Sequence, residues 1–414
     1  MSVSEELTNR GFVHQYSAES LAEILDGPKR TIYHGVDPTA DSIHAGNFAV
    51  WMLLRHLSDA GHKIILLVGG GTGMIGDPKP DVERTLTPPD VVAKRVEKLS
   101  AQAEKLLGAH KVTFVNNHDW LGKLHLIDFL RDIGKHFTIN ELIKKDAIAT
   151  RLKSDNGISY TEFAYPLLQA YDYLELHKKH KCDVQVGGSD QWGNIIAGVD
   201  LVRKKEQKTV YAITIPLIID KASGKKFGKS EGNAVWLDAE KTTPFAFYQF
   251  WLNTSDENVI DYSKIFTFLS LSEIERLKST FEANPGSRSA QKILAFEITK
   301  IVHGLERATV VQNVSEIIFG SRALSTMSLE EKKILVENAP TTKITKESSI
   351  VDVLVETTLA SSKREARTFI ERGAVSIGDT KFLNEKEVIP ENLFTQNLAI
   401  LRRGKKQVHI LEIK

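Results

Sequence analysis

The chain has 414 residues, of which 42% are hydrophobic and 26% are charged, and its formal net charge is +1. This length predicts two or three domains that each bury a core of their own. The composition excludes a disordered chain and a histone-like polycation, but it is compatible with local basic patches that bind nucleic acid.

The single cysteine, Cys182, excludes an intramolecular disulfide and fits a reducing compartment. His177 and His180 lie just before it, but this group is more typical of a solvated helix end than of a metal site, so we predict no bound metal. The acidic N-terminus is unlike a secretion signal or a transit peptide. The most apolar stretch, residues 63–71, is too short to span a bilayer. We therefore predict a cytoplasmic protein with no membrane contact.

The first half of the chain alternates short β-branched runs with helical patterns. The sequence predicts strands over residues 29–36, 62–70, 111–117, 182–188 and 211–219, and helices over residues 44–60, 89–107, 161–177 and 191–205. Buried strands separated by helices predict a parallel sheet covered on both faces. We therefore expect an α/β fold with a Rossmann-like, doubly wound catalytic domain over residues 1–238, whose ligands bind at the carboxyl ends of the strands.

The second half has a different pattern. Residues 239–330 read as several helices joined by short loops and predict an α-helical domain. Residues 331–348 predict a linker, and residues 349–414 predict a small α+β domain.

A glycine-rich stretch, "GGGTGMIG" at residues 69–76, follows a predicted strand and resembles a dinucleotide fingerprint. That fingerprint requires a helix to begin at once, and Pro78 and Pro80 prevent one here. A nicotinamide-dependent dehydrogenase is thus the weaker alternative. We expect these glycines to let the backbone approach a ligand closely, with Asp77 beside it.

The stretch "GKKFGKS" at residues 224–230 is close to a phosphate-binding P-loop but has one residue too few between its glycines. Seen alone, such a loop is typical of solvent-exposed lysines. Its glycines and its lysines nevertheless suit a mobile clamp for phosphates.

The predicted helix at residue 44 begins with "HAGN", in which a packing helix would gain little from its polar residues. His44 and Asn47 share one face of the first turn, and Gly46 leaves room for a ligand against the backbone. The free N–H groups and the positive dipole end of the turn predict an anion site, most simply for a nucleotide phosphate. In a doubly wound sheet, this turn and "GKKFGKS" can meet at the strand ends.

"HAGN" resembles the HIGH signature, and "KFGKS" the KMSKS signature, of class I aminoacyl-tRNA synthetases. With "YHGVDPTADSIHAGN", "LVGGGTGMIGDP", "FAYPLLQAYDY" and "QVGGSDQWGN", nearly the whole chain is similar to the bacterial tyrosyl-tRNA synthetases. The resemblance implies that tyrosine and ATP form tyrosyl-adenylate and pyrophosphate. The tyrosyl group then moves to the 3′-terminal ribose of the tRNA, and AMP is released. It also implies Mg²⁺ with ATP and a homodimer.

The resemblance further implies a role for individual residues. The residues implied to be catalytic are His44, Asn47, Arg84, Lys226 and Lys229. Those implied for ATP are Gly35, Asp37, His44, Gly46, Asn47, Gly188, Asp190, Lys226, Lys229 and Ser230. The chain departs from the family in three places: Asn47 replaces a commoner histidine, His34 stands where many relatives carry a cysteine near the ribose, and Lys79 lies earlier than the usual lysine before Arg84.

Tyr165, Gln169 and Asp172 form one stripe of a predicted helix. Taken alone, this polar stripe indicates a solvent-exposed face. The resemblance implies instead that Tyr165, Gln169 and Asp77 bind the ammonium of tyrosine, and that Tyr33 and Asp172 bind its phenolic hydroxyl. Gln191 is implied on the carboxyl side of the substrate. A hydroxyl-binding pair disfavours the tryptophan enzyme of the same class. An RNA-binding protein that has lost activity is disfavoured because His44, Lys226 and Lys229 are present.

The last predicted domain carries a helix start at Ser362 and Glu365, which form a capping box, and a helix end at Gly373. Its basic residues could simply be solvated, because acidic residues are also frequent there. The arrangement nevertheless resembles the small RNA-binding module of ribosomal proteins and pseudouridine synthases. The RNA-binding residues that we expect are Lys363, Arg364, Arg367, Arg402, Arg403, Lys405 and Lys406.

Overall fold

The computed structural model describes residues 1–79, 82–108, 112–153, 157–222, 224, 227, 229–230, 233–320, 322–404 and 407–414. These residues form two compact units. The first comprises residues 1–242 and 254–294, and the second comprises residues 243–253 and 295–414. No helix among the described residues is long and apolar enough to cross a membrane.

A six-stranded sheet with the order β1-β6-β5-β2-β3-β4 forms the centre of the first unit. Its strands are β1 (Gln15–Tyr16), β2 (Thr31–Val36), β3 (Lys63–Val68), β4 (Val112–Asn116), β5 (Val184–Gly188) and β6 (Tyr211–Ile215). All neighbouring pairs are parallel except β1 with β6. The five predicted strands are confirmed. The short edge strand β1 was not predicted, and β6 ends earlier than expected because the next residue, Pro216, has no N–H to donate.

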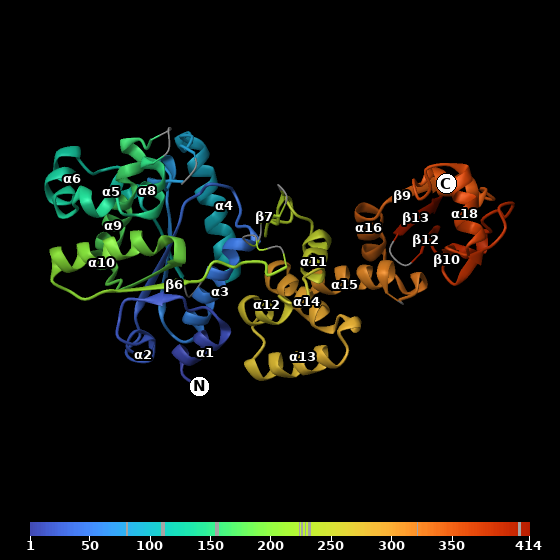
Figure 1. Cartoon of the computed structure of the whole chain (residues 1–414), viewed down its shortest axis with the longest axis horizontal. Coiled ribbons are helices and arrows are strands. Elements are labelled where there is room, and N and C mark those ends of the chain that lie inside the picture. The colour runs from blue at the N-terminus through green and yellow to red at the C-terminus, as the bar shows by residue number, and fades with distance from the viewer. Residues whose placement is uncertain are drawn as a thin grey trace. The chain divides into compact units, whose positions relative to one another are not determined.

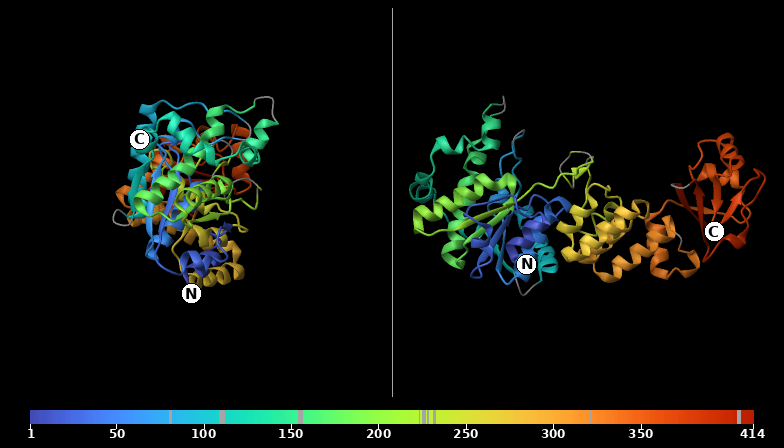
Figure 2. Two further views of the ribbon diagram at one scale, coloured as in Figure 1. Left: turned by 90° about the vertical axis from the view of Figure 1, so that its left-hand side faces the viewer. Right: turned by 60° about the horizontal axis from the view of Figure 1, so that its bottom comes forward.

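The four predicted helices of this unit form as α3 (Ala45–Asp59), α4 (Pro89–Leu107), α9 (Tyr160–His180) and α10 (Trp192–Glu206). Helices α9 and α10 lie on one side of the sheet, and α3 and α4 lie on the other (Figures 1 and 2). Residues Ile64–Val68 of β3 are accordingly all buried, as expected for a strand covered on both faces. The predicted doubly wound α/β fold is thus confirmed.

The strand order fixes the place of a binding site. The chain runs outward from β2 through β3 to β4, and then returns to β5 on the other side of β2. The connections therefore diverge between β2 and β5, and this leaves a crevice at the carboxyl ends of these two strands.

The other elements of the first unit are short helices and a hairpin. They are α1 (Val3–Arg10), α2 (Leu21–Leu25), α5 (His118–Leu121), α6 (Leu126–Asp132), α7 (Ile139–Leu142), α8 (Asp146–Leu152), α12 (Val259–Phe266), α13 (Leu271–Ala283) and the strands β7 (Lys229–Ser230) and β8 (Asn233–Ala234). Helix α12 is tied to α1 by Arg10, which donates to the carbonyls of Lys264 and Leu269 at 3.0 and 2.8 Å. The region predicted as a separate helical domain is thus divided between the two units.

The second unit contains helices and a second sheet. Its helices include α11 (Pro244–Leu252), α15 (Leu305–Phe319), α16 (Leu329–Asn338), α17 (Ile350–Glu356) and α18 (Lys363–Glu371), while α14 (Ser289–His303) runs from the first unit into the second. The sheet has the order β11-β10-β12-β13-β9, with β9 (Thr341–Ile344), β10 (Val375–Ile377), β11 (Thr380–Phe382), β12 (Leu398–Arg403) and β13 (Gln407–Ile413).

Two details of this unit differ from expectation. The stretch predicted as a linker, residues 331–348, contains most of α16 and all of β9, because β9 pairs in parallel with β13 far along the chain. The predicted cap of α18 forms only in part. Ser362 accepts from the backbone of Glu365, but the Glu365 carboxylate bonds Ser361 instead of closing the box. Gly373 has a φ of 61°, as expected after a helix end.

Candidate active site

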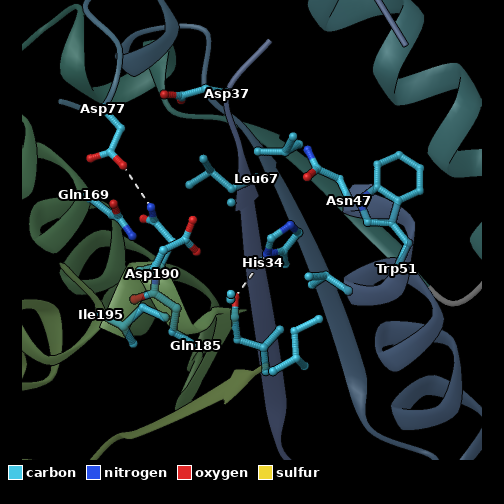
Figure 3. Close-up of a pocket in the computed structure, with 18 of the residues that line it drawn as sticks. His34, Asp37, Asn47, Trp51, Leu67, Asp77, Gln169, Gln185, Asp190 and Ile195 are labelled. Carbon is cyan, nitrogen blue, oxygen red and sulfur yellow. Dashed lines mark hydrogen bonds between the residues drawn. The ribbon is translucent and has the colours of Figure 1, made fainter. Parts of the chain in front are cut away.

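A cavity of about 280 Å³ lies at the carboxyl ends of β2 and β5. Asp77 and Gln169 lie on one side of it and Asn47 and Trp51 on the other, with His34 between them (Figure 3). All six residues expected to bind tyrosine line it: Tyr33, Asp77, Tyr165, Gln169, Asp172 and Gln191. So do seven of the residues expected for ATP or catalysis: Gly35, Asp37, Gly46, Asn47, Arg84, Gly188 and Asp190.

The stripe on α9 is not the solvent-exposed face that its pattern alone indicates. Tyr165 and Asp172 are 6% and 3% exposed. Burial raises the pKa of Asp172 to about 8, against hydrogen bonds from Asn117 and Trp120 that lower it. The Trp120 indole donates to Oδ1 at 2.7 Å and the Asn117 amide donates to Oδ2 at 2.9 Å. The Asp172 carboxyl group is thus held by two uncharged donors, the indole of Trp120 and the amide of Asn117.

Tyr33, on β2, is expected to pair with Asp172 around a hydroxyl. Its own hydroxyl is buried and has no hydrogen-bond partner among the described residues. Burial, followed by the charge of Asp172, raises the pKa of Tyr33 well above its ordinary value. An unsatisfied buried hydroxyl is costly unless a ligand supplies its partner.

Asp37 is connected to Asp172 through hydrogen-bonded side chains. Thr72 donates to its Oδ1 and Tyr165 donates to its Oδ2, both at 2.7 Å. Burial raises the pKa of Asp37 to about 6, although both hydrogen bonds lower it. Thr72 also accepts from Asn117 at 2.9 Å, so a continuous chain of hydrogen bonds links Asp37 to Asp172.

Asp77 lies in a cluster of amides. Its carboxylate accepts from Gln191 at 2.8 Å and from Asn194 at 3.1 Å, and the Asn194 amide also reaches Gln169 Oε1 at 3.2 Å. Lys145 donates to Asn194 Oδ1 at 3.2 Å, which fixes the orientation of that amide. Burial raises the pKa of Asp77 and lowers that of Lys145 to about 8.

The N–H groups of Ala45, Gly46 and Asn47 in the first turn of α3 all have hydrogen-bond partners, whereas we expected them to be free. His44 is the N-cap residue, and its Nδ1 accepts from Gly46 N at 3.0 Å. Ala45 N donates to the carbonyl of Val235 at 2.8 Å, and Asn47 N donates to that of His44 at 3.0 Å. Because Nδ1 is an acceptor, the proton of the neutral ring lies on Nε2. An anion at this turn would therefore be bound by side chains.

Gly46 is needed for a reason other than ligand stacking. A Cβ at this position would lie 2.6 Å from the carbonyl oxygen of Phe227 and 2.9 Å from His44 Cε1. His44 also pairs with Trp236 in an isolated bridge. The prediction that "HAGN" and "KFGKS" meet is thus confirmed for the described residues. Lys226, Lys405 and Lys406 lie outside the described residues, and Lys229 and Ser230 are described only by their backbone, in β7.

His34 and Cys182 have specific environments. His34 Nδ1 bonds the carbonyl of Val186 at 3.0 Å, and burial lowers the pKa of His34 to about 4, so the ring is neutral. Cys182 is fully buried, and its thiol contacts the carbonyls of Thr31 and Val184 at 3.4 and 3.6 Å. The sequence suggested a solvated helix end at this position, but the Cys182 side chain is buried.

The predicted RNA-binding residues mostly have intramolecular partners. Lys363 pairs with Asp352 at 2.7 Å, and Arg367 pairs with Glu385 at 2.6 Å. The Arg403 guanidinium lies 4.6 Å from the centre of the Phe369 ring. Arg402 reaches the carbonyl of Ile317 at 3.5 Å, and Arg364 is exposed on α18.

A model of the family "tRNA synthetases class I (W and Y)" matches residues 26–320. The chain belongs to this family of class I tRNA synthetases. A model of the "tyrosine–tRNA ligase SYY-like C-terminal domain" matches residues 331–411 of the synthetase. Both matches agree with the resemblance seen in the sequence, and the dehydrogenase alternative is wrong.

The synthetase is similar to named relatives over its whole length. It is 44% identical over 420 residues to tyrosine–tRNA ligase of Streptococcus mutans, covering 99% of this chain and 100% of that protein. It is 45% identical over 420 residues to tyrosine–tRNA ligase 1 of Enterococcus faecalis, covering 100% of both. A C-terminally truncated mitochondrial tyrosyl-tRNA synthetase of Aspergillus nidulans superposes with a TM-score of 0.68 at 31% identity. That match covers 75% of this chain and 92% of that one.

Proposed function

We propose that the cavity binds tyrosine with its phenolic hydroxyl between Tyr33 and Asp172, and that the synthetase joins this tyrosine to tRNA. The observation that carries this proposal is the unpartnered, buried hydroxyl of Tyr33, which lines the same cavity as the Asp172 carboxylate. A phenolic hydroxyl supplies a donor to the carboxylate and an acceptor to Tyr33. A phenyl ring or an indole would leave these buried groups without that hydroxyl, at a cost in binding free energy.

The ammonium of tyrosine needs acceptors, because it has only N–H groups to offer. Tyr165 donates its hydroxyl hydrogen to Asp37, so the Tyr165 oxygen still has lone pairs for the ammonium. Asp77 and Gln169 supply a carboxylate and an amide oxygen in the same cavity. These residues would fix one end of the substrate while Tyr33 and Asp172 fix the other.

ATP would lie beside the first turn of α3. There His44 Nε2–H and the exposed Asn47 amide would act as donors, and the resemblance assigns Lys226, Lys229 and Ser230 of "KFGKS" to the same phosphates. The nucleophile is the tyrosine carboxylate, which is already ionised at neutral pH and needs no general base. It attacks the α-phosphorus in line, and the bond to the pyrophosphate oxygen breaks. The protein's task is to hold this alignment and to neutralise the charge that develops on the phosphates.

Mg²⁺ would enter with ATP. Among the described residues, no group of three or more His, Cys, Asp or Glu side chains is placed to hold a metal ion. Mg²⁺ usually keeps several waters and is bound through substrate phosphates, so it does not require a protein cage. Asp37 and Asp190 line the cavity, and their carboxylates would orient those waters.

Each part of the chain would have its own function. Residues 1–238 would carry the ATP and tyrosine sites, and residues 239–330 would approach the anticodon side of the tRNA. Residues 349–414 would bind tRNA phosphates, together with β9, which completes the sheet of this last module. The basic residues of α18 support the last assignment, because their ion pairs with Asp352 and Glu385 are exposed. Exposed pairs contribute little and exchange readily for phosphate. Activity on tRNA also suggests that the protein acts in the cytoplasm.

A homodimer is the final element of the proposal. Large apolar side chains are exposed on successive helices from α6 to α9: Leu126 (68%), Ile127 (69%), Ile139 (60%), Leu152 (51%) and Tyr160 (69%). Contiguous exposed apolar patches are typical of association surfaces, and these side chains would form the patch at which two copies meet. The double substitution Ile127→Asp/Tyr160→Asp should give a monomer by light scattering. A dimer that persists would place the interface elsewhere.

Exchange of labelled pyrophosphate into ATP tests the proposed reaction, with tyrosine, phenylalanine or tryptophan as the amino acid. Tyrosine alone should support rapid exchange, and tRNA should then accept the tyrosyl group. Exchange that is faster with tryptophan would favour the tryptophan enzyme. No exchange with any of the three would favour a protein that only binds RNA.

A further inference from the structure

Arg151 on α8 and Glu162 on α9 form a fully buried ion pair outside the residues to which we assigned a role. Their side chains are 0% and 2% exposed, and Arg151 Nη2 lies 3.1 Å from Glu162 Oε2. Taking two charges out of water costs enough to offset most or all of their attraction, so a buried pair is weak evidence for a role in stability alone. Its other contacts show what it holds.

Both members of the pair hold the same segment of backbone. Arg151 Nη1 donates to the carbonyls of Lys79 and Val82 at 3.1 and 2.8 Å. Glu162 Oε1 accepts from the backbone N–H of Arg84 at 3.2 Å. The described residues of this segment belong to no helix or strand, so their polar backbone groups depend on such side-chain partners.

The clamped segment carries two residues that line the cavity, Asp77 and Arg84. Arg84 Nε donates to the carbonyl of Asp77 at 2.8 Å. Gly76 has a φ of 85°, and a Cβ there would lie 3.2 Å from Arg84 Cγ, so the Arg84 side chain folds back closely over the start of the segment. The position of the Arg84 guanidinium therefore depends on the backbone that Arg151 and Glu162 hold.

We propose that Arg151 and Glu162 are positioning residues that place Arg84 for the activation of tyrosine. This inference rests on the catalytic role that the family resemblance implies for Arg84. An arginine at position 151 suits the positioning of this backbone because its planar guanidinium has five N–H donors. Arg151 Nε donates to the carbonyl of Gly157 at 2.7 Å, which leaves the other donors for the carbonyls of the segment and for Glu162. Asp77 is held in addition by Gln191 and Asn194, so loosening the clamp should disturb Arg84 more than the ammonium site.

The double substitution Arg151→Met/Glu162→Gln tests this inference without leaving an unpaired buried charge. The kcat of tyrosine-dependent pyrophosphate exchange should fall on the order of 10- to 100-fold, as expected when a catalytic group is misplaced. The KM for tyrosine should change by no more than about twofold. The matched control is Arg30→Met/Asp183→Asn. That ion pair, at 2.9 Å, lies at the amino ends of β2 and β5, whereas the cavity lies at their carboxyl ends, so it should be removable without effect on kcat.

Arg84→Ala provides the background that separates positioning from a general structural effect. If the clamp acts through Arg84, the double substitution should cost little further kcat in the Arg84→Ala protein. A full, additive loss in that background, or an unchanged kcat in the parent protein, would overturn the inference. An Arg84→Ala protein with full activity would instead overturn the proposed role of Arg84, and the inference with it.

Glu162→Asp keeps the charge pair but shortens the reach of the carboxylate, and it serves if the double variant does not fold. It should show the same fall in kcat and the same dependence on Arg84. A Glu162→Asp protein with the parental kcat would count against the inference.

Discussion

Trp120 donates its indole N–H to Oδ1 of Asp172 over 2.7 Å, and this bond turns the carboxylate into a fixed acceptor in the cavity. Asn117 holds the other oxygen at 2.9 Å, so the carboxylate cannot rotate without breaking a hydrogen bond. Each oxygen still has a lone pair for a ligand. A fixed acceptor beside the unpartnered Tyr33 hydroxyl is what recognition of a phenol requires.

Asp172→Asn should therefore damage the use of tyrosine specifically. The kcat/KM for tyrosine should fall about 10- to 100-fold, the range for leaving a buried polar group without its hydrogen-bond partner. Phenylalanine has no hydroxyl and makes no such bond, so the ratio of kcat/KM for tyrosine to that for phenylalanine should fall. The KM for ATP should stay the same. Steady-state exchange with both amino acids measures this. The control is Asp200→Asn, which removes an exposed carboxylate paired with Arg203. An unchanged KM and kcat for tyrosine would show that the pocket is assigned wrongly.

The same carboxyl should make stability depend on pH. Burial raises the pKa of Asp172 to about 8 and that of Asp37 to about 6, from ordinary values near 3.8. A raised pKa means that the folded state binds protons more tightly, so the free energy of unfolding falls as pH rises from about 4 to 8. Above pH 6 Asp37 is mostly ionised in the folded state as well, so between pH 6 and 8 the remaining decrease in the free energy of unfolding comes from Asp172. Thermal unfolding without ligand should thus have a flatter pH dependence over this range in Asp172→Asn than in the parent or in Asp200→Asn. Identical slopes would refute the raised pKa.

The sequence predicted the sheet and its main helices because both depend on local periodicity. Asn117, Trp120 and Lys145 were missed because they lie in short helices and turns whose pattern is not periodic. The stripe of Tyr165, Gln169 and Asp172 was recognised only through family resemblance, since a cavity wall and a solvent-exposed face can have the same polar pattern.

Long-range pairing explains the remaining differences. The first turn of α3 lacks free N–H groups because Val235, almost two hundred residues away, accepts from Ala45. The short run that forms β9 reads as a linker because its partner, β13, lies at the end of the chain. Neither partner can be identified from the spacing of residues.

His44 should have two separable roles. Its Nδ1 caps α3 by accepting from Gly46 N, and in the proposed reaction Nε2–H would donate to the phosphates. Asparagine can retain the cap but not the remote donor, whereas glutamine can retain the donor at the expense of the cap. His44→Asn should therefore fold normally but activate tyrosine on the order of 100-fold more slowly, as for loss of one transition-state donor. His44→Gln should be faster than His44→Asn but less stable by about 1 kcal/mol. A parental rate in His44→Asn would rule out the phosphate role.

Lys226 and Lys229 should act mainly in the transition state. Charge moves onto the pyrophosphate as it leaves, so a lysine there gains most at that moment. Lys226→Ala and Lys229→Ala should lower the single-turnover rate of adenylate formation and leave the Kd for tyrosine unchanged. Lys221→Ala is the control from the same part of the chain, because Lys221 pairs with Asp261 at 2.6 Å. Equal losses in rate and in tyrosine binding would contradict a transition-state role.

The last module should matter for tRNA and not for adenylate. A cut at residue 347 would leave β9 without β13, so the better truncation keeps residues 1–339 and removes the whole sheet. This protein should retain pyrophosphate exchange, because the residues that line the cavity all precede the cut. It should charge tRNA far more slowly, because the contacts to phosphates are lost.

A charge variant of the full chain tests the same module without truncation. The triple variant Lys363→Ala/Arg364→Ala/Arg367→Ala should make the binding of tRNA less dependent on salt. The negative slope of log K for association against log salt concentration should become smaller in magnitude by roughly 2 to 3, since each phosphate contact contributes about 0.7 to 0.9. Lys333 pairs with Glu337 on α16, so Lys333→Ala is a control that should keep the parental slope. Filter binding across a series of salt concentrations gives both slopes. A truncated protein that charges tRNA at the full-length rate, together with an unchanged salt slope in the triple variant, would remove the RNA-binding role from this module.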